Sequence, residues 1–241
     1  MRNGGTALDE AKVRRVLDRI GDRNGWNSGD EPALDRLLRG TDAQPELGDV
    51  LEVYRDGAFA SPPEIGLLLY SAVRSIKPDV VVELGTSYGF STLHIAAALR
   101  DNGHGTVFTS EIDPRKARDA TWNFTAAGLH SHVRLLLGDA ATSLKGFGEQ
   151  VDLVYLDSWV GSYLDALTVL RPALRPGAQI YANSTRRFDV QARPYLDHVR
   201  DSANGFFSVE VPLGNGLEAS TYVSRELREE SIGAIESGKV G

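Results

Sequence analysis

The chain has 241 residues, 41% hydrophobic and 24% charged, which is typical of a globular protein with one sizeable core. Its 26 basic and 33 acidic side chains give a net charge of −7, which argues against general binding to nucleic acid or anionic membranes. The chain has no cysteine, so disulfides, thiolate metal sites and a cysteine nucleophile are excluded. We therefore expect one main domain with a small-molecule partner.

The ends of the chain predict no membrane anchor. No apolar run approaches the roughly 18 to 20 residues of a membrane helix, and the first residues lack the apolar core of a secretory signal. The expected location is therefore the cytoplasm. The charged tail at residues 225–241 ends in Ser-Gly-Lys-Val-Gly and is expected to fray.

The N-terminal part, residues 1–60, predicts a helical cap. Apolar side chains recur at helical spacing in three segments, at residues 7–22, 31–39 and 46–55. Pro62 and Pro63 fit the first turn of a further helix that runs to about Ser75, with Ser61 as its N-cap. The cap helices offer a surface for a second copy of the chain, so a homodimer is one option.

Residues 61–224 predict an α/β domain, because short apolar runs alternate with amphipathic segments. We expect parallel strands at residues 79–84, 106–111, 133–137, 152–157 and 178–183. We expect helices between them at residues 90–100, 114–127, 161–174 and 188–201. Two β-rich runs at 206–211 and 219–223, separated by Pro-Leu-Gly-Asn-Gly, predict an antiparallel hairpin at one edge. The result is a doubly wound, Rossmann-like sheet of seven strands.

The first strand-to-helix turn of this sheet is a candidate ligand site, since open α/β sheets bind ligands beyond the carboxyl ends of their strands. The turn contains Gly85 and Gly89, but Ser87 stands where a dinucleotide fingerprint has its second glycine. A nucleoside that carries an amino acid and no phosphate tolerates this serine, and its carboxylate can lie near the helix N-terminus with Ser91 as a donor. S-adenosylmethionine is such a molecule, whereas a nicotinamide-dependent oxidoreductase is disfavoured.

Two further acids follow neighbouring strands. Glu111 ends the second strand, where a carboxylate can accept hydrogen bonds from a ribose, and Asp139 follows the third, where it can accept from an adenine amino group. Each acid alone could simply cap a helix, and Asp139 is a strong N-cap candidate that could do both. Together with Glu83, these acids predict a nucleoside pocket.

At these residues the sequence resembles the class I S-adenosylmethionine-dependent methyltransferases, and among them the catechol and caffeoyl-CoA type O-methyltransferases. The resemblance covers about residues 60–224. Its motifs are Glu83-Leu-Gly-Thr-Ser-Tyr-Gly-Phe-Ser91, Glu111-Ile-Asp-Pro114 and Asp152-Leu-Val-Tyr-Leu-Asp-Ser-Trp-Val-Gly-Ser-Tyr163. It implies a cofactor site formed by Ser61, Glu83, Gly85, Ser87, Tyr88, Ser91, Glu111, Asp139, Ala140, Asp157 and Trp159. Packing at the sheet edge explains Trp159 equally well.

The resemblance also implies a divalent cation, typically magnesium, bound by an Asp after the fourth strand and an Asp-Asn pair after the fifth. Asp157 matches the first ligand, but the pair reads Asn183 and Ser184, so one anionic ligand of a hard cation is lost. The lysine with which the family assists deprotonation of the acceptor falls at Val160. A metal is therefore doubtful, and we assign no metal ligands.

We predict an enzyme that transfers a methyl group from S-adenosylmethionine to a small molecule, with oxygen as the expected acceptor atom. Asp157 and Asn183 are the predicted catalytic residues, although Asn183 could bond only the backbone, and one of the five histidines is an alternative base. Arg186 and Arg187 either recognise an anionic acceptor or belong to a solvated loop. The alternatives are a metal-independent N- or C-methyltransferase and a cofactor-binding protein with decayed catalysis.

Overall fold

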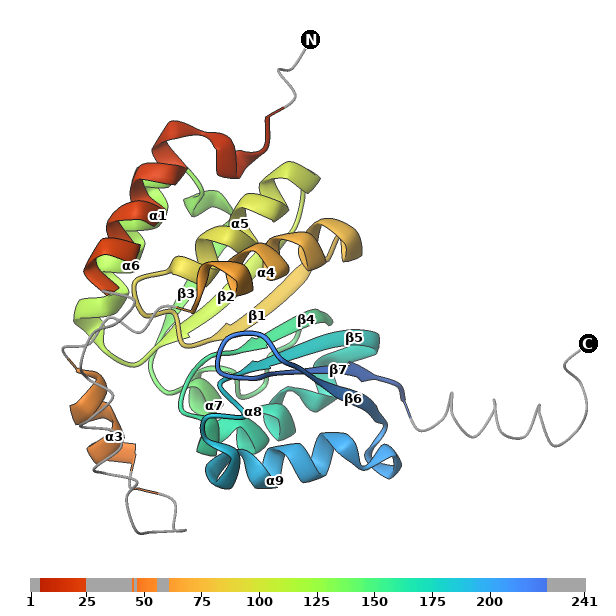
Figure 1. The fold of residues 1–241 in the computed structure, drawn as a ribbon. Coiled ribbons are helices and arrows are strands. Elements are labelled where there is room, and N and C mark those ends of the chain that lie inside the picture. Colours follow the sequence, from red (N-terminus) through yellow and green to blue (C-terminus); the bar gives the residue numbers. More distant parts are fainter. Residues whose placement is uncertain (1–4, 25–44, 46, 56–60, 225–241) are drawn as a thin grey trace, which may run out of the picture.

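The computed structural model describes residues 5–24, 45, 47–55 and 61–224. Its centre is a seven-stranded sheet with the order β3-β2-β1-β4-β5-β7-β6 (Figure 1). The strands are β1 (Val80–Leu84), β2 (Thr106–Glu111), β3 (Val133–Leu137), β4 (Val151–Leu156), β5 (Leu174–Asn183), β6 (Phe206–Val211) and β7 (Leu217–Tyr222). The first five are parallel, β7 pairs antiparallel with β5, and β6 with β7. The predicted sheet, with its edge hairpin, is confirmed.

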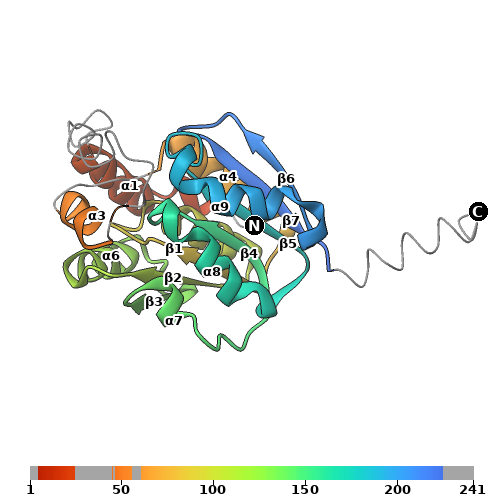
Figure 2. The same ribbon diagram turned by 90° about the horizontal axis from the view of Figure 1, so that it is seen from below.

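Helices cover both faces of the sheet (Figures 1 and 2). One hydrophobic cluster joins one face to α1 (Ala11–Asn24), α4 (Pro63–Ile76), α5 (Phe90–Asn102) and α6 (Pro114–Ala127). The other joins the opposite face to α8 (Tyr163–Leu170) and α9 (Asp189–Arg200), with α7 (Ala140–Ser143) on the same side. The short α3 (Leu47–Tyr54) lies beside the carboxyl edge of the strands (Figure 1). The predicted helix at 31–39 and the tail at 225–241 lie outside the described residues.

The central strands are continuous apolar runs because helices cover both of their sides. All residues of β1 and β4 are buried, as expected for parallel strands in the middle of a doubly wound sheet. Glu83 is the exception within β1, since it is a carboxyl group with no exposed surface. A buried acid at the end of a central strand marks this edge of the sheet as the place to look for a ligand site.

Three predicted boundaries are wrong. The first helix is a 3-10 turn at Ala7–Asp9 followed by α1, since Glu10 between them has an extended backbone. The predicted helix at 161–174 is α8 with a 3-10 turn at each end, and Pro172 lies in the second turn, where it cannot continue an α-helix. The fifth strand consequently begins at Leu174, four residues earlier than predicted.

The predicted N-cap is also wrong. Pro62 occupies the cap position of α4, and no side chain caps the helix there. The hydroxyl of Ser61 is instead directed to the carboxyl edge of the sheet, where it contacts Tyr155 and Asp157. Ser61 is therefore a residue of the site and not of the helix end.

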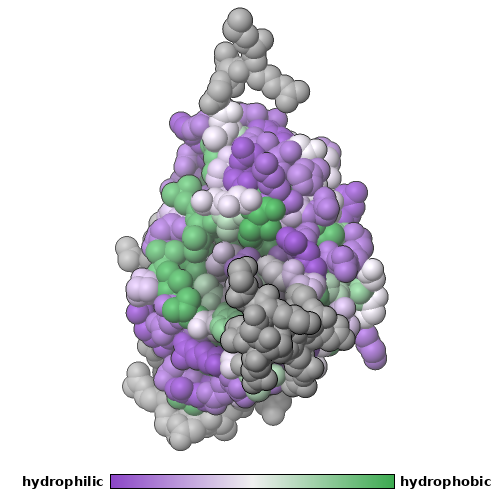
Figure 3. All heavy atoms as spheres, turned by 90° about the vertical axis from the view of Figure 1, so that its right-hand side faces the viewer, coloured by the Kyte–Doolittle hydropathy of each residue, from purple (hydrophilic) through white to green (hydrophobic). Residues whose placement is uncertain are grey.

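The surface of the described residues is mostly polar. Figure 3 shows one face on which hydrophilic side chains dominate and apolar ones gather toward one side. The large apolar side chains that are most exposed are Leu67, Trp122, Leu137, Phe207 and Val209. None of the described helices is both long and apolar enough to span a membrane.

Candidate active site

The turn between β1 and α5 is shaped by two glycines in the left-handed region. A Cβ on Gly85, whose φ is +93°, would lie 2.4 Å from the carbonyl oxygen of Asp157, and one on Gly89 would meet the ring of Phe124 at the same distance. Ser87 also has a positive φ of 48°, which is uncommon for a residue with a side chain. Its N–H donates to the carboxylate of Glu111 over 2.7 Å, so an acid of the neighbouring strand holds this turn.

Glu83 lies beneath this turn. Its Oε2 accepts hydrogen bonds from the hydroxyls of Thr92 and Thr109, the latter at 2.6 Å, and the nearby hydroxyl of Ser91 also favours the charged form. Burial raises its pKa to about 7, against the opposing effect of these hydrogen bonds. One of its oxygens, Oε1, has no partner among the described residues. A buried acceptor without a partner is costly, which favours a ligand donor at this point.

Glu111 at the end of β2 is the second acid of the site. Its two oxygens accept from the backbone N–H groups of Ser87 and Asp113, at 2.7 and 2.8 Å. Burial raises its pKa, although these backbone hydrogen bonds oppose the effect. A carboxylate has about four acceptor positions, so it can hold both backbone groups and still accept from a ligand.

Asp139 and Trp159 each make a structural contact of the kind that the sequence offered as the alternative to a cofactor role. Asp139 accepts a hydrogen bond of 3.0 Å from the N–H of Thr142 in α7, the helix that begins at Ala140, so the N-cap interpretation of this acid is supported. The ring of Trp159 packs against Phe188 with 5.5 Å between ring centroids. Neither contact tests the predicted adenine neighbourhood, which stays a prediction.

Asp157 follows β4 and is the centre of a polar network. It accepts hydrogen bonds from Ser61 at 2.6 Å and from the side-chain amide of Asn183 at 2.8 Å, and the hydroxyl of Tyr155 lies 2.7 Å from that of Ser61. Burial raises the pKa of Asp157 to about 6, although the hydrogen bonds to its carboxylate oppose this effect. The site therefore holds a carboxylate with neutral partners.

A pocket lies between this network and the turn after β1. Its lining includes α1 as well as the sheet edge, and consists of Ile20, Ser61, Gly85, Thr86, Ser87, Tyr88, Phe90, Ser91 and Asp157. Six of the predicted site residues thus share one pocket. Glu111 supports it through its hydrogen bond from the N–H of Ser87, and Glu83 lies beneath it, whereas Asp139, Trp159 and Asn183 are not part of its lining.

Asp157 is the one predicted base in this pocket, because no histidine lines it. His94 is buried in α5, where its Nδ1 lies 2.9 Å from the carbonyl oxygen of Phe90 and burial lowers its pKa. The rings of His104 and His132 contact backbone carbonyl oxygens of loops near the amino ends of the strands.

Two tyrosines near Asp157 were missed by sequence reasoning. Tyr155 belongs to an apolar strand, but it stands two residues before Asp157 and therefore on the same side of the chain, a signal that was available. Tyr54 ends α3. Its pKa is raised to about 12 by burial and by the negative charge of Asp157, so its hydroxyl lies near the network. No sequence pattern connects Tyr54 with the sheet.

The residues present do not fit a magnesium ion. The described part of the chain contains no group of three or more His, Asp or Glu side chains that could hold a metal. Both oxygens of Asp157 already accept hydrogen bonds, and Asn183 turns its amide NH₂ toward this carboxylate. Hard cations need oxygen ligands, preferably anionic, so an N–H donor beside a single carboxylate opposes binding.

Comparisons with known proteins agree with this geometry. Residues 82–185 match a family described as a methyltransferase domain. The catechol O-methyltransferase B of Danio rerio is 32% identical over 197 residues, which cover 71% of this chain and 73% of the relative. The O-methyltransferase TomG from Streptomyces achromogenes, solved with SAM, superimposes with a TM-score of 0.62 at 19% identity, covering 84% of this chain and 99% of TomG. A methyltransferase from Geobacter sulfurreducens has a TM-score of 0.61 at 24% identity, with coverage of 80% and 96%.

The fold and these matches define a class I methyltransferase. Within this class, the chain belongs to the family of S-adenosylmethionine-dependent O-methyltransferases.

Proposed function

We propose that S-adenosylmethionine binds at the carboxyl edge of β1, β2 and β4 and that Asp157 and Asn183 act on the acceptor beside it. The cofactor residues of this proposal are Ser61, Glu83, Gly85, Ser87, Tyr88, Ser91, Glu111, Asp139, Ala140, Asp157 and Trp159. The observation that carries the proposal is that Asp157 and the turn after β1, which Glu111 holds, line one small hollow of about 10 Å³ at this edge of the sheet. The acceptor is a hydroxyl group of a small molecule.

When bound, S-adenosylmethionine would supply the activated methyl group that the acceptor oxygen takes up. Asp157 accepts the proton of the acceptor hydroxyl, which becomes acidic as the oxygen–carbon bond forms. Its buried position and its fixed hydrogen bonds keep this carboxylate in place for the transfer. Asn183 has a buried Oδ1 without a partner among the described residues, so it can accept a hydrogen bond from the acceptor.

We further propose that this transfer needs no divalent cation. The support is the donor set around Asp157, in which neutral hydroxyl and amide groups take the positions that a cation would need. O-methylation accounts for the family match better than the alternatives of N- or C-methylation and of decayed catalysis. The predicted homodimer and cytoplasmic location rest on the sequence alone.

The experiment is a methyl-transfer assay with a panel of phenols and amines, with and without a chelator, on the wild type and on Asp157→Asn. We expect turnover of phenols that a chelator does not reduce. The variant should lose about 100-fold or more in kcat, a larger effect than any change in its affinity for S-adenosylmethionine. Turnover that requires added magnesium would refute metal independence. Cofactor binding without turnover of any acceptor would favour decayed catalysis.

A further inference from the structure

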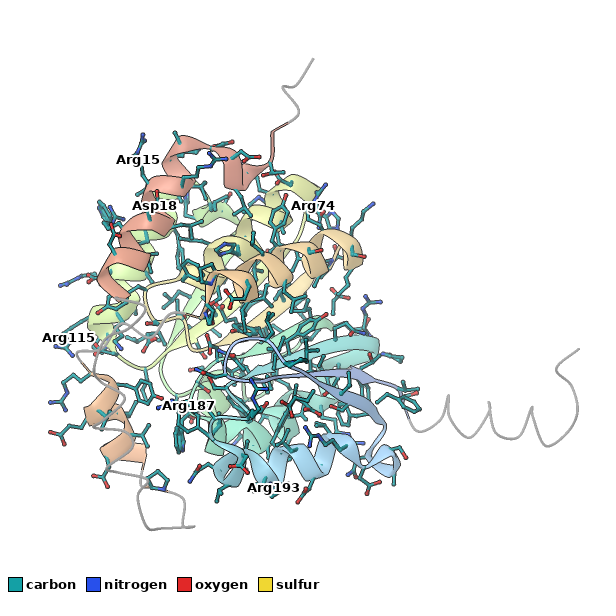
Figure 4. All side chains as sticks on the ribbon, in the orientation of Figure 1. Arg15, Asp18, Arg74, Arg115, Arg187 and Arg193 are labelled. Carbon is teal, nitrogen blue, oxygen red and sulfur yellow. The ribbon has the colours of Figure 1, made fainter. Side chains whose placement is uncertain are left out.

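The turn at residues 212–216, between β6 and β7, lies at the carboxyl edge of the sheet because β7 pairs antiparallel with β5. Figure 4 shows Arg187, in the segment after β5, beside this turn. The turn contacts two parts of the chain, the segment that follows Asn183 and the start of α4 directly after Ser61. Both Asn183 and Ser61 donate hydrogen bonds to the carboxylate of Asp157, so the turn lies behind both of these donors.

The contact with the segment after β5 is made by backbone groups. The N–H of Thr185 donates to the carbonyl of Gly216 over 3.2 Å, and the N–H of Arg187 donates to that of Asn215 over 3.0 Å. A Cβ on Gly216 would lie 2.4 Å from the Cβ of Arg186 and 2.7 Å from its backbone nitrogen, so this approach requires glycine. Two hydrogen bonds and one close approach therefore fix the path of the segment.

Asn183 depends on this support because the residue that follows it is strained. Asn183 is the last residue of β5, and Ser184 has a φ of 61°, in the left-handed region that residues with a side chain seldom adopt. Such a conformation persists only where neighbouring contacts hold it, and the hydrogen bond from Thr185 to Gly216 is the next contact along the chain. A change at Ser184 would turn the amide of Asn183 away from Asp157.

The other side of the turn packs on the start of α4. A Cβ on Gly214 would lie 3.3 Å from Cγ of Pro62 and 3.5 Å from Cδ1 of Ile65. Pro62 is the cap residue of α4 and directly follows Ser61, whose side chain is buried. The turn is therefore in contact with the neighbour of the second donor to Asp157.

We propose that the turn at residues 212–216 positions the carboxylate of Asp157 from behind, with Gly216 as the positioning residue that holds Asn183 in place. The inference deepens the proposed function, on which it rests only for its effect on methyl transfer. The turn itself touches neither the acceptor nor the hollow that Asp157 lines.

The test follows the ionisation of Asp157 by carbon-13 NMR of protein labelled at the aspartate carboxyl carbons, with Asp157→Asn to identify the signal. The variants are Gly216→Ala, Asn183→Ala and the control Gly177→Ala. The φ of Gly177, +88°, is close to the +94° of Gly216, but a Cβ on Gly177 would meet nothing within 4 Å. The control therefore carries the backbone strain of a left-handed alanine without the contact.

Loss of the donor from Asn183 destabilises the charged form of Asp157. The midpoint of its titration should therefore rise by about one pH unit in Asn183→Ala, and by a similar amount in Gly216→Ala. Gly177→Ala should keep the midpoint of the wild type. Gly214→Ala acts on the other support through Pro62 and should raise the midpoint by a smaller amount, which keeps the test decisive if Gly216→Ala does not fold.

The ionisable side chains that interact with Asp157 are Glu83 of β1, Tyr155 of β4, Tyr163 of α8 and Tyr54 of α3. Burial raises the pKa of all three tyrosines, so they stay neutral while Asp157 titrates. The pKa of Glu83 is about 7, so the titrations are repeated with Glu83→Gln in every protein. The same order of midpoints is expected in this background.

Methyl transfer to catechol is the second measurement. Gly216→Ala and Asn183→Ala should each lower kcat by about tenfold or more, with a smaller change in KM for S-adenosylmethionine. Because both act on one hydrogen bond, the double variant should lose no more than the stronger single variant. Gly177→Ala should keep the kcat of the wild type.

A wild-type midpoint in Gly216→Ala, or an equal rise in Gly177→Ala, would overturn the inference. If Gly216→Ala does not fold, a wild-type midpoint in Gly214→Ala would overturn it as well. Midpoints that shift as expected in a protein that methylates no acceptor would support the positioning of Asp157 and contradict the proposed function instead.

Discussion

The side-chain amide of Asn183 donates a hydrogen bond of 2.8 Å to the carboxylate of Asp157. A neutral donor therefore faces the acid at the position where the resemblance seen in the sequence implies a second carboxylate. This hydrogen bond makes the site unlike a magnesium site, because Asn183 presents an N–H where magnesium needs an anionic oxygen.

The substitution Asn183→Asp should create a site that responds to magnesium. Two facing carboxylates repel each other, so the free energy of unfolding at neutral pH should fall by about 1–3 kcal/mol and be restored by millimolar MgCl₂. The wild type and Asn183→Ala should show no such response in thermal unfolding with MgCl₂ or chelator. Stabilisation of the wild type by magnesium would contradict our account of the site.

Methyl transfer should depend on pH through Asp157. Its pKa is raised to about 6, and a general base must be deprotonated, so kcat should rise as pH increases through about 6 and then level off. The measurement is the pH profile of kcat with the cofactor at saturation. Asp157→Asn should lose this inflection along with most of its activity. An inflection that persists unchanged in the variant belongs to another group.

The stability of the free protein should depend on pH through Glu83. The pKa of this buried acid is raised from 4.5 to about 7, so the folded state binds more protons than the unfolded state between these values. The free energy of unfolding is therefore highest below the unfolded pKa of Glu83. It falls as pH rises toward 7, by at most about 3 kcal/mol. Urea unfolding across this range should show the slope, and Glu83→Gln should reduce it, leaving the part that comes from the raised pKa values of Asp157 and Glu111. An equal slope in both proteins would rule out this origin.

Glu111→Ala should weaken binding of S-adenosylhomocysteine by a few kcal/mol, since it removes a charged acceptor and frees the backbone N–H of Ser87. Titration calorimetry measures the affinity. Glu111→Gln keeps one acceptor oxygen, so its affinity for S-adenosylhomocysteine should lie between those of the wild type and the alanine variant. An unchanged affinity in Glu111→Ala would place the ribose elsewhere.

Arg200→Ala should destabilise the fold. Arg200 makes two hydrogen bonds, of 2.9 and 2.6 Å, to Glu218, a carboxylate with no exposed surface. Without the arginine, Ser208 is the one hydrogen-bond partner left to this buried carboxylate among the described residues, so we expect a loss of about 2–4 kcal/mol in the free energy of unfolding. The matched control is Arg193→Ala in the same helix, whose pair with Asp189 is exposed and should contribute below about 0.5 kcal/mol. Similar losses in both variants would show that the destabilisation comes from replacing an arginine in this helix, and not from breaking the buried pair.

Sequence reasoning placed Glu83 and Glu111 at one edge of the sheet because rules of the fold fix the ends of parallel strands. Glu83 and Glu111 end neighbouring parallel strands, and carboxyl ends of such strands meet at one edge. Ser87 was identified as an unusual residue of the turn, and the structure gives it a left-handed backbone. Local periodicity and strand order were sufficient to predict where these residues lie in the fold.

The rest depended on tertiary contacts that no local pattern encodes. Ser61 precedes two prolines and so matches a helix cap. Its hydroxyl instead donates to Asp157, which lies 96 residues further along the sequence. Tyr155 is hidden in an apolar strand, and Tyr54 reaches the site from a separate helix. Pro172 ended a helix that apolar spacing alone extended to residue 174.

A crystal structure with bound S-adenosylhomocysteine tests the central claim most directly. Our account predicts the ribose at Glu111, the amino-acid end near Ser91, and the sulfur on the side of the pocket that Asp157 lines. A product bound at another edge of the sheet, or a sulfur separated from Asp157 by the wall of the pocket, would contradict it.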